Sequence, residues 1–155
     1  MKRFDFKLEP LLGYRGYLEK RARQETAEAL RKVKTSEEMI EQLKKRYAEC
    51  REDLEDVTSR GVSAGRFRHY QNYLDSVESG IEEESDRKKS LDKVLGEKMA
   101  ELKSRRINKK VIEQLKERKV TEYMEELRKF EQSELDEVVS LRKAREINDD
   151  DDSSF

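Results

Sequence analysis

The seam residues between positions 22 and 57 recur at alternating steps of four and three. The series is Ala22, Thr26, Ala29, Val33, Ser36, Ile40, Leu43, Tyr47, Cys50, Leu54 and Val57. An unbroken alternation with an average period of 3.5 residues is typical of the a and d positions of a coiled coil. Leu11, Tyr14 and Leu18 extend the stripe upstream, and Pro10 suits the first turn of a helix, where its missing N–H does no harm. The pattern predicts a first helix over about 8–58.

A turn and a second helix follow. Two glycines and three hydroxyl residues fall within 58–65, so we expect a turn at about 59–65, with Ser63 as the N-cap of the next helix. A second stripe then predicts a helix over about 66–147, although Glu84 and Lys88 occupy two polar seam positions. Its apolar members are Phe67, Tyr70, Leu74, Val77, Ile81, Leu91, Leu95, Met99, Leu102, Ile112, Leu115, Tyr123, Leu127, Phe130, Leu135, Val138 and Leu141.

Two long helices joined by a short turn run antiparallel. Pairing residues whose numbers add to about 124 places apolar seam positions of both helices opposite each other, for example Leu43 opposite Ile81. The expected fold class is therefore all-α: two long helices forming an antiparallel coiled-coil hairpin, the second longer than the first. We expect one hairpin domain over 1–148 and a disordered acidic tail over 149–155.

The longer second helix leaves part of its stripe without a partner. The section after about Lys116 has nothing opposite it within the hairpin, yet apolar positions continue from Tyr123 to Leu141. An apolar helix face is costly to leave in water, so this section should meet another surface. It can dock on a partner protein, bend back, or pair with a second copy of the chain.

The composition fits a rod better than a round core. Of 155 residues, 46% are charged and 34% hydrophobic, and a coiled-coil seam needs only two apolar positions in seven. The net charge of −1 gives no overall attraction to nucleic acid or anionic membrane. One cysteine excludes an internal disulfide framework, and no stretch resembles a secretory signal or a membrane span. These features predict a cytosolic protein.

The charge is distributed unevenly. Residues 1–23 carry seven basic and three acidic side chains, and residues 103–119 carry eight basic and two acidic ones. The expected register places these segments side by side as a basic stalk at the open end of the hairpin. This surface is either a solvated helical face or a docking surface for an acidic partner.

The residues needed for catalysis or cofactor binding are missing. His69 is the single histidine, Cys50 falls on the seam, and the six glycines form no phosphate-binding loop. We therefore expect no catalytic, cofactor-binding or metal-binding residues, no cofactor, and no enzymatic activity. The sequence leaves open a self-associating structural coiled coil and a chaperone that holds substrate proteins.

Three segments resemble the FliJ family. They are Phe4-Asp5-Phe6-Lys7-Leu8-Glu9-Pro10-Leu11-Leu12-Gly13-Tyr14-Arg15 at the start, Gly61-Val62-Ser63 with Tyr70-Gln71-Asn72-Tyr73-Leu74 at the turn, and Val111–Lys119 with Tyr123 and Glu131-Gln132-Ser133-Glu134-Leu135-Asp136-Glu137 near the end. The Phe-x-Phe-x-Leu opening and the Glu-Gln-x-x-Leu-Asp-Glu ending do not follow from heptad composition, so they weigh most.

The resemblance implies a component of flagellar type III export. Members of this family form an antiparallel coiled coil similar to the central stalk of rotary ATP synthases. They bind the hexameric ring of the export ATPase FliI and the export gate protein FlhA, promote export, and act as general chaperones. Export substrates or other chaperones are further implied partners. The implied location is cytoplasmic, at the inner-membrane export apparatus, with membrane contact only through protein partners and no nucleic acid bound.

The resemblance and the hairpin together suggest two docking sets. The ATPase-docking set at the open end is Phe4, Phe6, Leu8, Leu11, Leu12, Tyr14, Arg15, Ile112, Leu115, Arg118, Tyr123, Leu135, Asp136 and Glu137. The gate-docking set near the turn is Met39, Leu43, Tyr47, Tyr70, Tyr73, Leu74 and Val77. The alternative for both sets is that their members only pack the hairpin.

Overall fold

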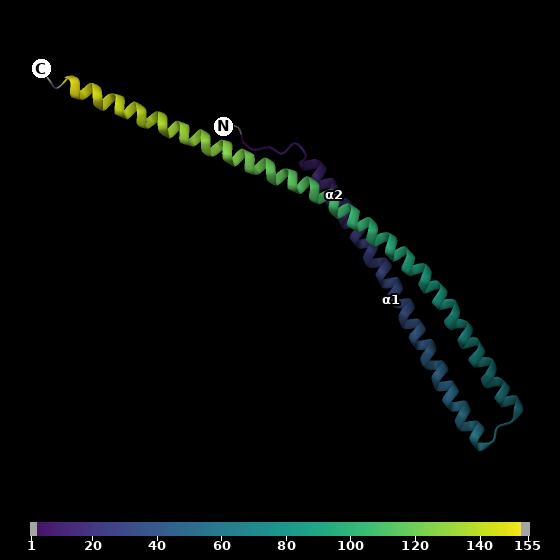
Figure 1. The fold of residues 1–155 in the computed structure, drawn as a ribbon. Coiled ribbons are helices and arrows are strands. Elements are labelled where there is room, and N and C mark those ends of the chain that lie inside the picture. Colours follow the sequence, from purple (N-terminus) through teal and green to yellow (C-terminus); the bar gives the residue numbers. More distant parts are fainter. Residues whose placement is uncertain (1–2, 153–155) are drawn as a thin grey trace. The chain divides into compact units, whose positions relative to one another are not determined.

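The chain forms two long helices joined by a three-residue turn. A computed structural model describes the backbone of residues 3–152 and the side chains of residues 3–145. Helix α1 spans Glu9–Arg60 and helix α2 spans Ala64–Asp152, and the described residues include no strand (Figure 1). Leucine, glutamate, lysine and arginine dominate both helices, and these side chains lose little freedom in a helix. The all-α fold class is confirmed.

Two compact units divide the chain. The hairpin unit is Gly16–Ile107, and the end unit is Met1–Arg15 together with Asn108–Phe155. Each helix contributes to both units. The hairpin unit contains the turn and most of the seam, whereas the end unit contains the start of α1 and the C-terminal part of α2.

The turn is shorter than the sequence suggested. Helix α1 continues to Arg60, and only residues 61–63 separate it from α2, instead of about 59–65. The hydroxyls of Thr58 and Ser59 donate hydrogen bonds back to carbonyls of α1, each at 2.7 Å, so they do not interrupt the helix. Gly61 then ends α1 with a φ of +88°, which favours glycine.

Ser63 is the N-cap of α2, as predicted. Its Oγ accepts a hydrogen bond from the amide of Arg66 at 3.3 Å, and its carbonyl accepts one from the amide of Phe67 at 2.9 Å. The side chain thus satisfies one of the amides that lack a partner inside the first turn of the helix.

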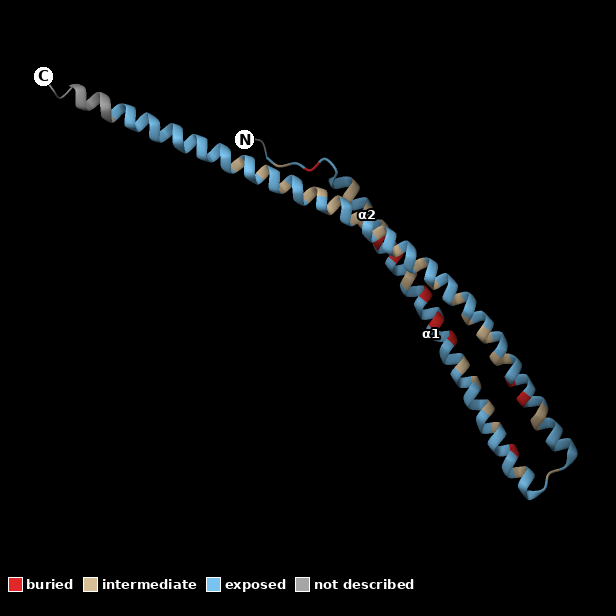
Figure 2. Cartoon of the chain, viewed as in Figure 1, coloured by how far each residue is buried: buried red, intermediate tan, exposed pale blue. Residues whose placement is uncertain are grey.

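The core of the hairpin unit is a narrow seam along the facing sides of α1 and α2 (Figure 2). Small and medium side chains fill it, because two helices alone leave their seam open to solvent along both edges. Its buried members are Glu19, Ala22, Ala29, Val33, Ser36, Leu54, Leu74 and Val77.

Cross-helix contacts follow the expected register. Within the hairpin unit, ion pairs join Lys88 to Glu37, Lys98 to Glu25 and Arg106 to Glu19, and their residue numbers add to between 123 and 125. In each pair the carboxylate belongs to α1 and the cation to α2. Exposed ion pairs contribute little stability. If either helix paired with a copy of itself, however, the like charges of these residues would face each other, so the pairs disfavour that arrangement.

A polar layer interrupts the seam where Glu84 and Lys88 were expected. The hydroxyl of Ser36 is buried and donates a hydrogen bond to Glu84 Oε1 at 2.7 Å. Lys88 Nζ lies 3.3 Å from Glu37. Both polar seam residues of α2 therefore have partners on α1, which removes much of the cost of placing them there.

Helix α2 runs farther than expected. It continues through Asp152, so its backbone includes four residues of the tail that the sequence predicted to be disordered, and residues 153–155 lie outside the described residues. Propagating an existing helix adds one hydrogen bond for each residue fixed, which favours extension of α2 into the acidic segment despite its charge repulsion.

Candidate docking surfaces

The N-terminal arm, residues 3–8, packs along α2 in the end unit. The Phe4 ring lies 5.5 Å from the ring of Tyr123, centroid to centroid, with the planes tilted by 52°. Phe6 is buried, and Lys116 Nζ lies 6.0 Å from the centroid of its ring. The same ammonium group pairs with Glu9 at 2.7 Å. Lys116 therefore links the arm, the first turn of α1 and α2.

This arrangement corrects the prediction that α2 lacks a partner after about Lys116. An extended chain rises about 3.3 Å per residue, whereas a helix rises about 1.5 Å, so a short arm covers a longer stretch of helix. The arm covers α2 as far as Tyr123, and Leu127 is the last half-buried residue of α2 among the described side chains.

The structure separates the ATPase-docking set into two groups. Phe6 is buried, and the half-buried members help to pack the end unit: Phe4, Leu11, Leu12, Arg15, Ile112, Leu115 and Tyr123. The exposed members are Leu8, Tyr14, Arg118, Leu135, Asp136 and Glu137. Only the second group presents side chains that a partner can reach without opening the unit.

Two arginines of the end unit have unused hydrogen-bonding capacity. The Nε of Arg15 is buried without a hydrogen-bond partner, and Arg118 makes no ion pair with a described residue. Lys109, Lys116 and Lys119 differ, because each pairs with a glutamate. Sequence counting missed this distinction, since it treated all basic residues alike.

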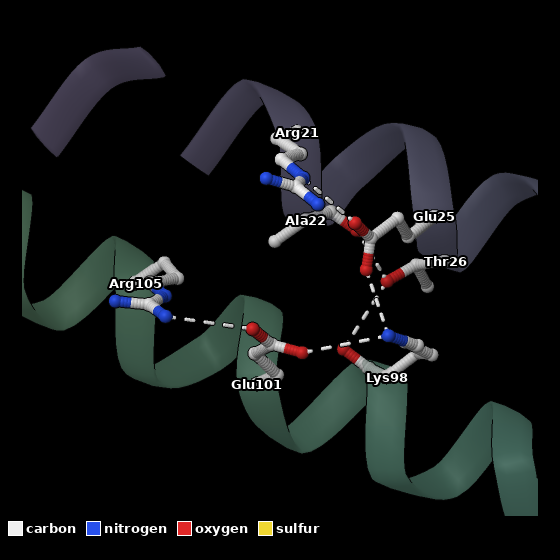
Figure 3. Close-up of polar contacts among 7 residues, drawn as sticks. All are labelled: Arg21, Ala22, Glu25, Thr26, Lys98, Glu101 and Arg105. Atoms are coloured by element: carbon white, nitrogen blue, oxygen red, sulfur yellow. Dashed lines mark hydrogen bonds and ion pairs between the residues drawn. The ribbon is translucent and has the colours of Figure 1, made fainter. Parts of the chain in front are cut away.

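The basic segments of the hairpin unit are largely neutralised by glutamates. Figure 3 shows Lys98 Nζ between Glu25 at 2.7 Å and Glu101 at 3.7 Å. Arg21 binds Glu25 at 3.0 Å, and Arg105 lies 3.5 Å from Glu101. Four basic residues of the predicted stalk thus pair with glutamates of the hairpin unit: Arg21, Arg23, Arg105 and Arg106.

The ion pairs of Glu25 shift the protonation of their members. The hydrogen bond from Lys98, followed by that from Arg21, lowers the pKa of Glu25. The hydrogen bond to Glu25 and its charge raise the pKa of Lys98. Thr26 adds a hydrogen bond at 3.2 Å to the carbonyl of Lys98, so charged and neutral contacts fix the same register.

The gate-docking set divides in the same way. Leu74 and Val77 are buried in the seam, and Leu43, Tyr47 and Tyr70 are half-buried. Met39 and Tyr73 are exposed. The set therefore has a structural part on the seam and two side chains that a partner can contact directly.

A shallow hollow of about 430 Å³ lies beside the turn-proximal seam. Tyr70 and Tyr73 line it on α2 together with His69, and Arg46 and Cys50 line it on α1. Sequence reasoning did not assign Arg46 to this surface, although its spacing of four from Cys50 places both on adjacent turns of one helix face.

Cys50 contributes an inert side chain to this hollow. Burial, and secondarily the charge of Asp53, raises the pKa of its thiol. The neutral thiol is a weak nucleophile and behaves as a small apolar group.

Two further findings concern the described part of the chain. It contains no cluster of three or more histidine, cysteine, aspartate or glutamate side chains arranged to hold a metal ion. Neither helix offers, within this part, a stretch long and apolar enough to cross a membrane.

The sequence profile of the flagellar FliJ proteins matches residues 4–148. The chain belongs to the FliJ family. It is accordingly a component of flagellar type III export, in a family of non-catalytic proteins that interact with other parts of the export apparatus. The match begins at Phe4, the first aromatic residue of the arm, so the arm is part of the family pattern.

Comparison with solved structures gives one similar protein, a YscO homologue from Chlamydia trachomatis. The two chains are 22% identical, and the similarity covers 90% of this FliJ-family chain and 94% of the other, with a TM-score of 0.48. No curated protein matches the chain.

Proposed function

We propose that this FliJ-family protein is a non-enzymatic stalk that binds the ring of the export ATPase FliI and also the export gate protein FlhA. It promotes export and acts as a general chaperone for exported proteins. In this proposal the protein lies in the cytoplasm at the inner-membrane export apparatus and reaches the membrane only through protein partners.

The unused cations of the end unit support the ATPase contact. Arg118 is exposed and makes no ion pair with a described residue, whereas the neighbouring Lys116 is paired with Glu9. Arg15 is half-buried, and its Nε is buried without a hydrogen-bond partner. Guanidinium groups bind carboxylates through two parallel hydrogen bonds, so an acidic surface on the ATPase suits them. Tyr14 is 56% exposed and adds an aromatic side chain on the same unit.

The first test is the ATP hydrolysis rate of the cognate export ATPase, at fixed ATPase concentration, with increasing amounts of this protein. A rise that saturates supports the stalk. No change, with no co-elution of the two proteins, contradicts it and favours a self-associating rod or a chaperone that only holds substrates.

Charge reversal tests which residues carry the contact. We expect Arg15→Glu and Arg118→Glu to retain helical content by circular dichroism and to bind the ATPase at least about tenfold more weakly, because each loses a charge-assisted contact. Lys44→Glu makes the same charge change on the exposed surface of the hairpin unit and should bind normally. Equal binding by all three variants would refute the electrostatic contact.

The exposed tyrosine of the hollow supports the gate contact. Tyr73 lines the hollow and is 46% exposed, so a partner can bury its ring without unfolding the seam. We expect Tyr73→Ala to weaken binding to the cytoplasmic part of FlhA, while Tyr17→Ala, at another exposed tyrosine of the hairpin unit, leaves it unchanged. Identical binding by the two variants would move the gate contact away from this hollow.

A further inference from the structure

The C-terminal part of α2 is a helix whose apolar face has no cover. Every residue from Arg128 to Arg145 is exposed (Figure 2). Phe130, Val138 and Leu141 are among them, with exposed fractions between 44% and 55%. Helices in proteins owe most of their stability to packing of an apolar face, and this stretch has none within the described residues.

The apolar residues form one straight stripe. At about 100° per residue, Leu127, Phe130, Val138 and Leu141 fall within about 80° of the helix circumference. Leu127 is followed by Val138, and Phe130 by Leu141, each after 11 residues. An 11-residue repeat is close to the natural helical period, so the stripe stays on one side for about 21 Å. A single straight helix can cover it.

Carboxylates surround this stripe. Residues 120–137 contain seven acidic and two basic side chains. By the same helical geometry, Glu126 and Glu137 border one edge of the stripe, Glu131 borders the other, and Glu134 lies in its centre. None of these four glutamates makes an ion pair with a described residue.

The two basic residues of this band do not neutralise the stripe. Arg128 and Lys129 lie about 120° and 140° from its centre, on the other side of the helix. From Glu126 to Glu137 the free face is therefore apolar in composition and negative in charge, whereas Arg142 and Arg145 add positive charge to this face only after Leu141.

We propose that the stripe formed by Leu127, Phe130, Val138 and Leu141 docks a basic amphipathic helix of another protein, with a lysine or arginine of that helix opposite Glu134. A charged residue at a single seam position sets register and partner choice, because an apolar or acidic residue opposite it leaves the charge unpaired. Basic residues flanking the partner's own stripe would meet the glutamates at the two edges.

A second copy of this chain fits the stripe poorly. The antiparallel register that pairs Leu127 with Leu141, and Phe130 with Val138, places Glu134 directly opposite the Glu134 of the other copy. Like charges at the centre of a seam oppose association. The glutamate that favours a basic partner thus disfavours self-pairing.

The proposal goes beyond the stalk function and does not depend on it. Arg15 and Arg118 are not part of the stripe. Of the ATPase-docking set, Leu135 and Asp136 fall outside the stripe by helical geometry, and Glu137 only borders its edge. Loss of ATPase binding in the arginine variants therefore leaves the stripe intact, and the two proposals can fail separately.

The test uses the full chain and two synthetic peptides. Both are amphipathic helices of about 22 residues with leucines at matching 11-residue spacing and lysines at the edges. They differ only at the central seam position, which is lysine in one and glutamate in the other. By fluorescence anisotropy we expect the lysine peptide to bind at least about tenfold more tightly.

A charge reversal at the seam should reverse this preference. Glu134→Lys should bind the glutamate peptide more tightly than the lysine peptide. Glu125→Lys makes the same change on the opposite side of the helix and should keep the original order. If neither peptide binds, or if Glu125→Lys reverses the order as well, the proposal is wrong.

A second pair of variants tests the apolar part. Leu141 and Val139 are 55% and 50% exposed, but only Leu141 belongs to the stripe. Leu141→Asp should weaken binding of the lysine peptide at least about tenfold, and Val139→Asp should not. Equal losses would overturn the proposal. Sedimentation equilibrium tests the remaining occupant. If the chain alone dimerises and Leu141→Asp abolishes the dimer, a second copy covers the stripe and the proposal is overturned.

Discussion

Replacing Phe6 by alanine should release the N-terminal arm without unfolding the hairpin unit. Phe6 is the one buried apolar side chain of the arm, at 9% exposure, and its ring also lies under the Lys116 ammonium group. Truncating a fully buried phenylalanine costs about 3–5 kcal/mol, but Phe6 keeps 9% of its surface exposed. Because Phe6→Ala buries less apolar area, we expect the free energy that holds the arm on the end unit to fall by about 2 kcal/mol.

This loss has a measurable consequence for proteolysis. The amide of Glu9 donates a hydrogen bond to the carbonyl of Phe6 at 2.9 Å, so the arm must open before a protease can bind the peptide bond after Lys7. A loss of about 2 kcal/mol raises the open fraction about thirtyfold, and cleavage follows this fraction when opening is fast. Brief trypsin digestion with mass spectrometry measures the rate of cut after Lys7.

Tyr14→Ala is the matched control, because Tyr14 is an exposed aromatic residue of the same unit. Its cleavage rate after Lys7 should stay within about twofold of the parent protein. An unchanged rate in Phe6→Ala would show that the buried ring does not hold the arm. A large fall in the melting temperature of the whole chain would refute the separation of arm and hairpin.

Three predictions concern the hairpin unit. Folding lowers the pKa of Glu25, so its carboxylate stabilises the folded state above the unfolded pKa of about 4.3, and this stabilisation is lost as the pH falls through the lower folded pKa. The variant Glu25→Gln should therefore lose less thermal stability between pH 7 and pH 3 than the parent protein. Identical curves of melting temperature against pH would contradict this. Leu54→Ala should cost about 2 kcal/mol in urea unfolding, because Leu54 is buried, while the exposed Leu30→Ala should cost less than about 0.5 kcal/mol; similar losses would mean that the seam is not the core. Gly61→Ala should destabilise the folded protein by about 1–2 kcal/mol, because Gly61 has a φ of +88°. Gly65→Ala should be neutral or stabilising in the same urea assay, because Gly65 lies within α2 and faces open space. A neutral Gly61→Ala would show that the turn changes its backbone conformation to accept alanine.

The seam was the most predictable part of the fold. Steps of four and three placed Ala29, Val33 and Leu54 on one face of α1, and all three are buried. The register followed from the turn position, because shifting one helix by a residue moves its stripe away from the partner. The length of the turn could not be predicted in the same way. The hydroxyls of Thr58 and Ser59 donate hydrogen bonds to carbonyls of α1, and whether they do so depends on the local backbone geometry.

The candidate surfaces were less predictable. A helical period cannot describe the arm, so the cover that Phe4 and Phe6 give to α2 was missed. Nor can charge counting show which cations are already paired: Lys116 and Arg118 are two positions apart, yet only Lys116 has a carboxylate partner. The cover by the arm and the pairing of Lys116 both involve side chains that are far apart in sequence, and a local sequence pattern does not encode such contacts.

The contact between Phe4 and Tyr123 joins positions 119 residues apart. A ribosome adds about 5–20 residues per second, so the arm waits roughly 6–24 s after its own synthesis before Tyr123 is made. During that time its two phenylalanines have no place to pack. Phe4 therefore stays uncovered until 119 further residues have been synthesised, and any chain interrupted before Tyr123 offers proteases and chaperones an open aromatic arm.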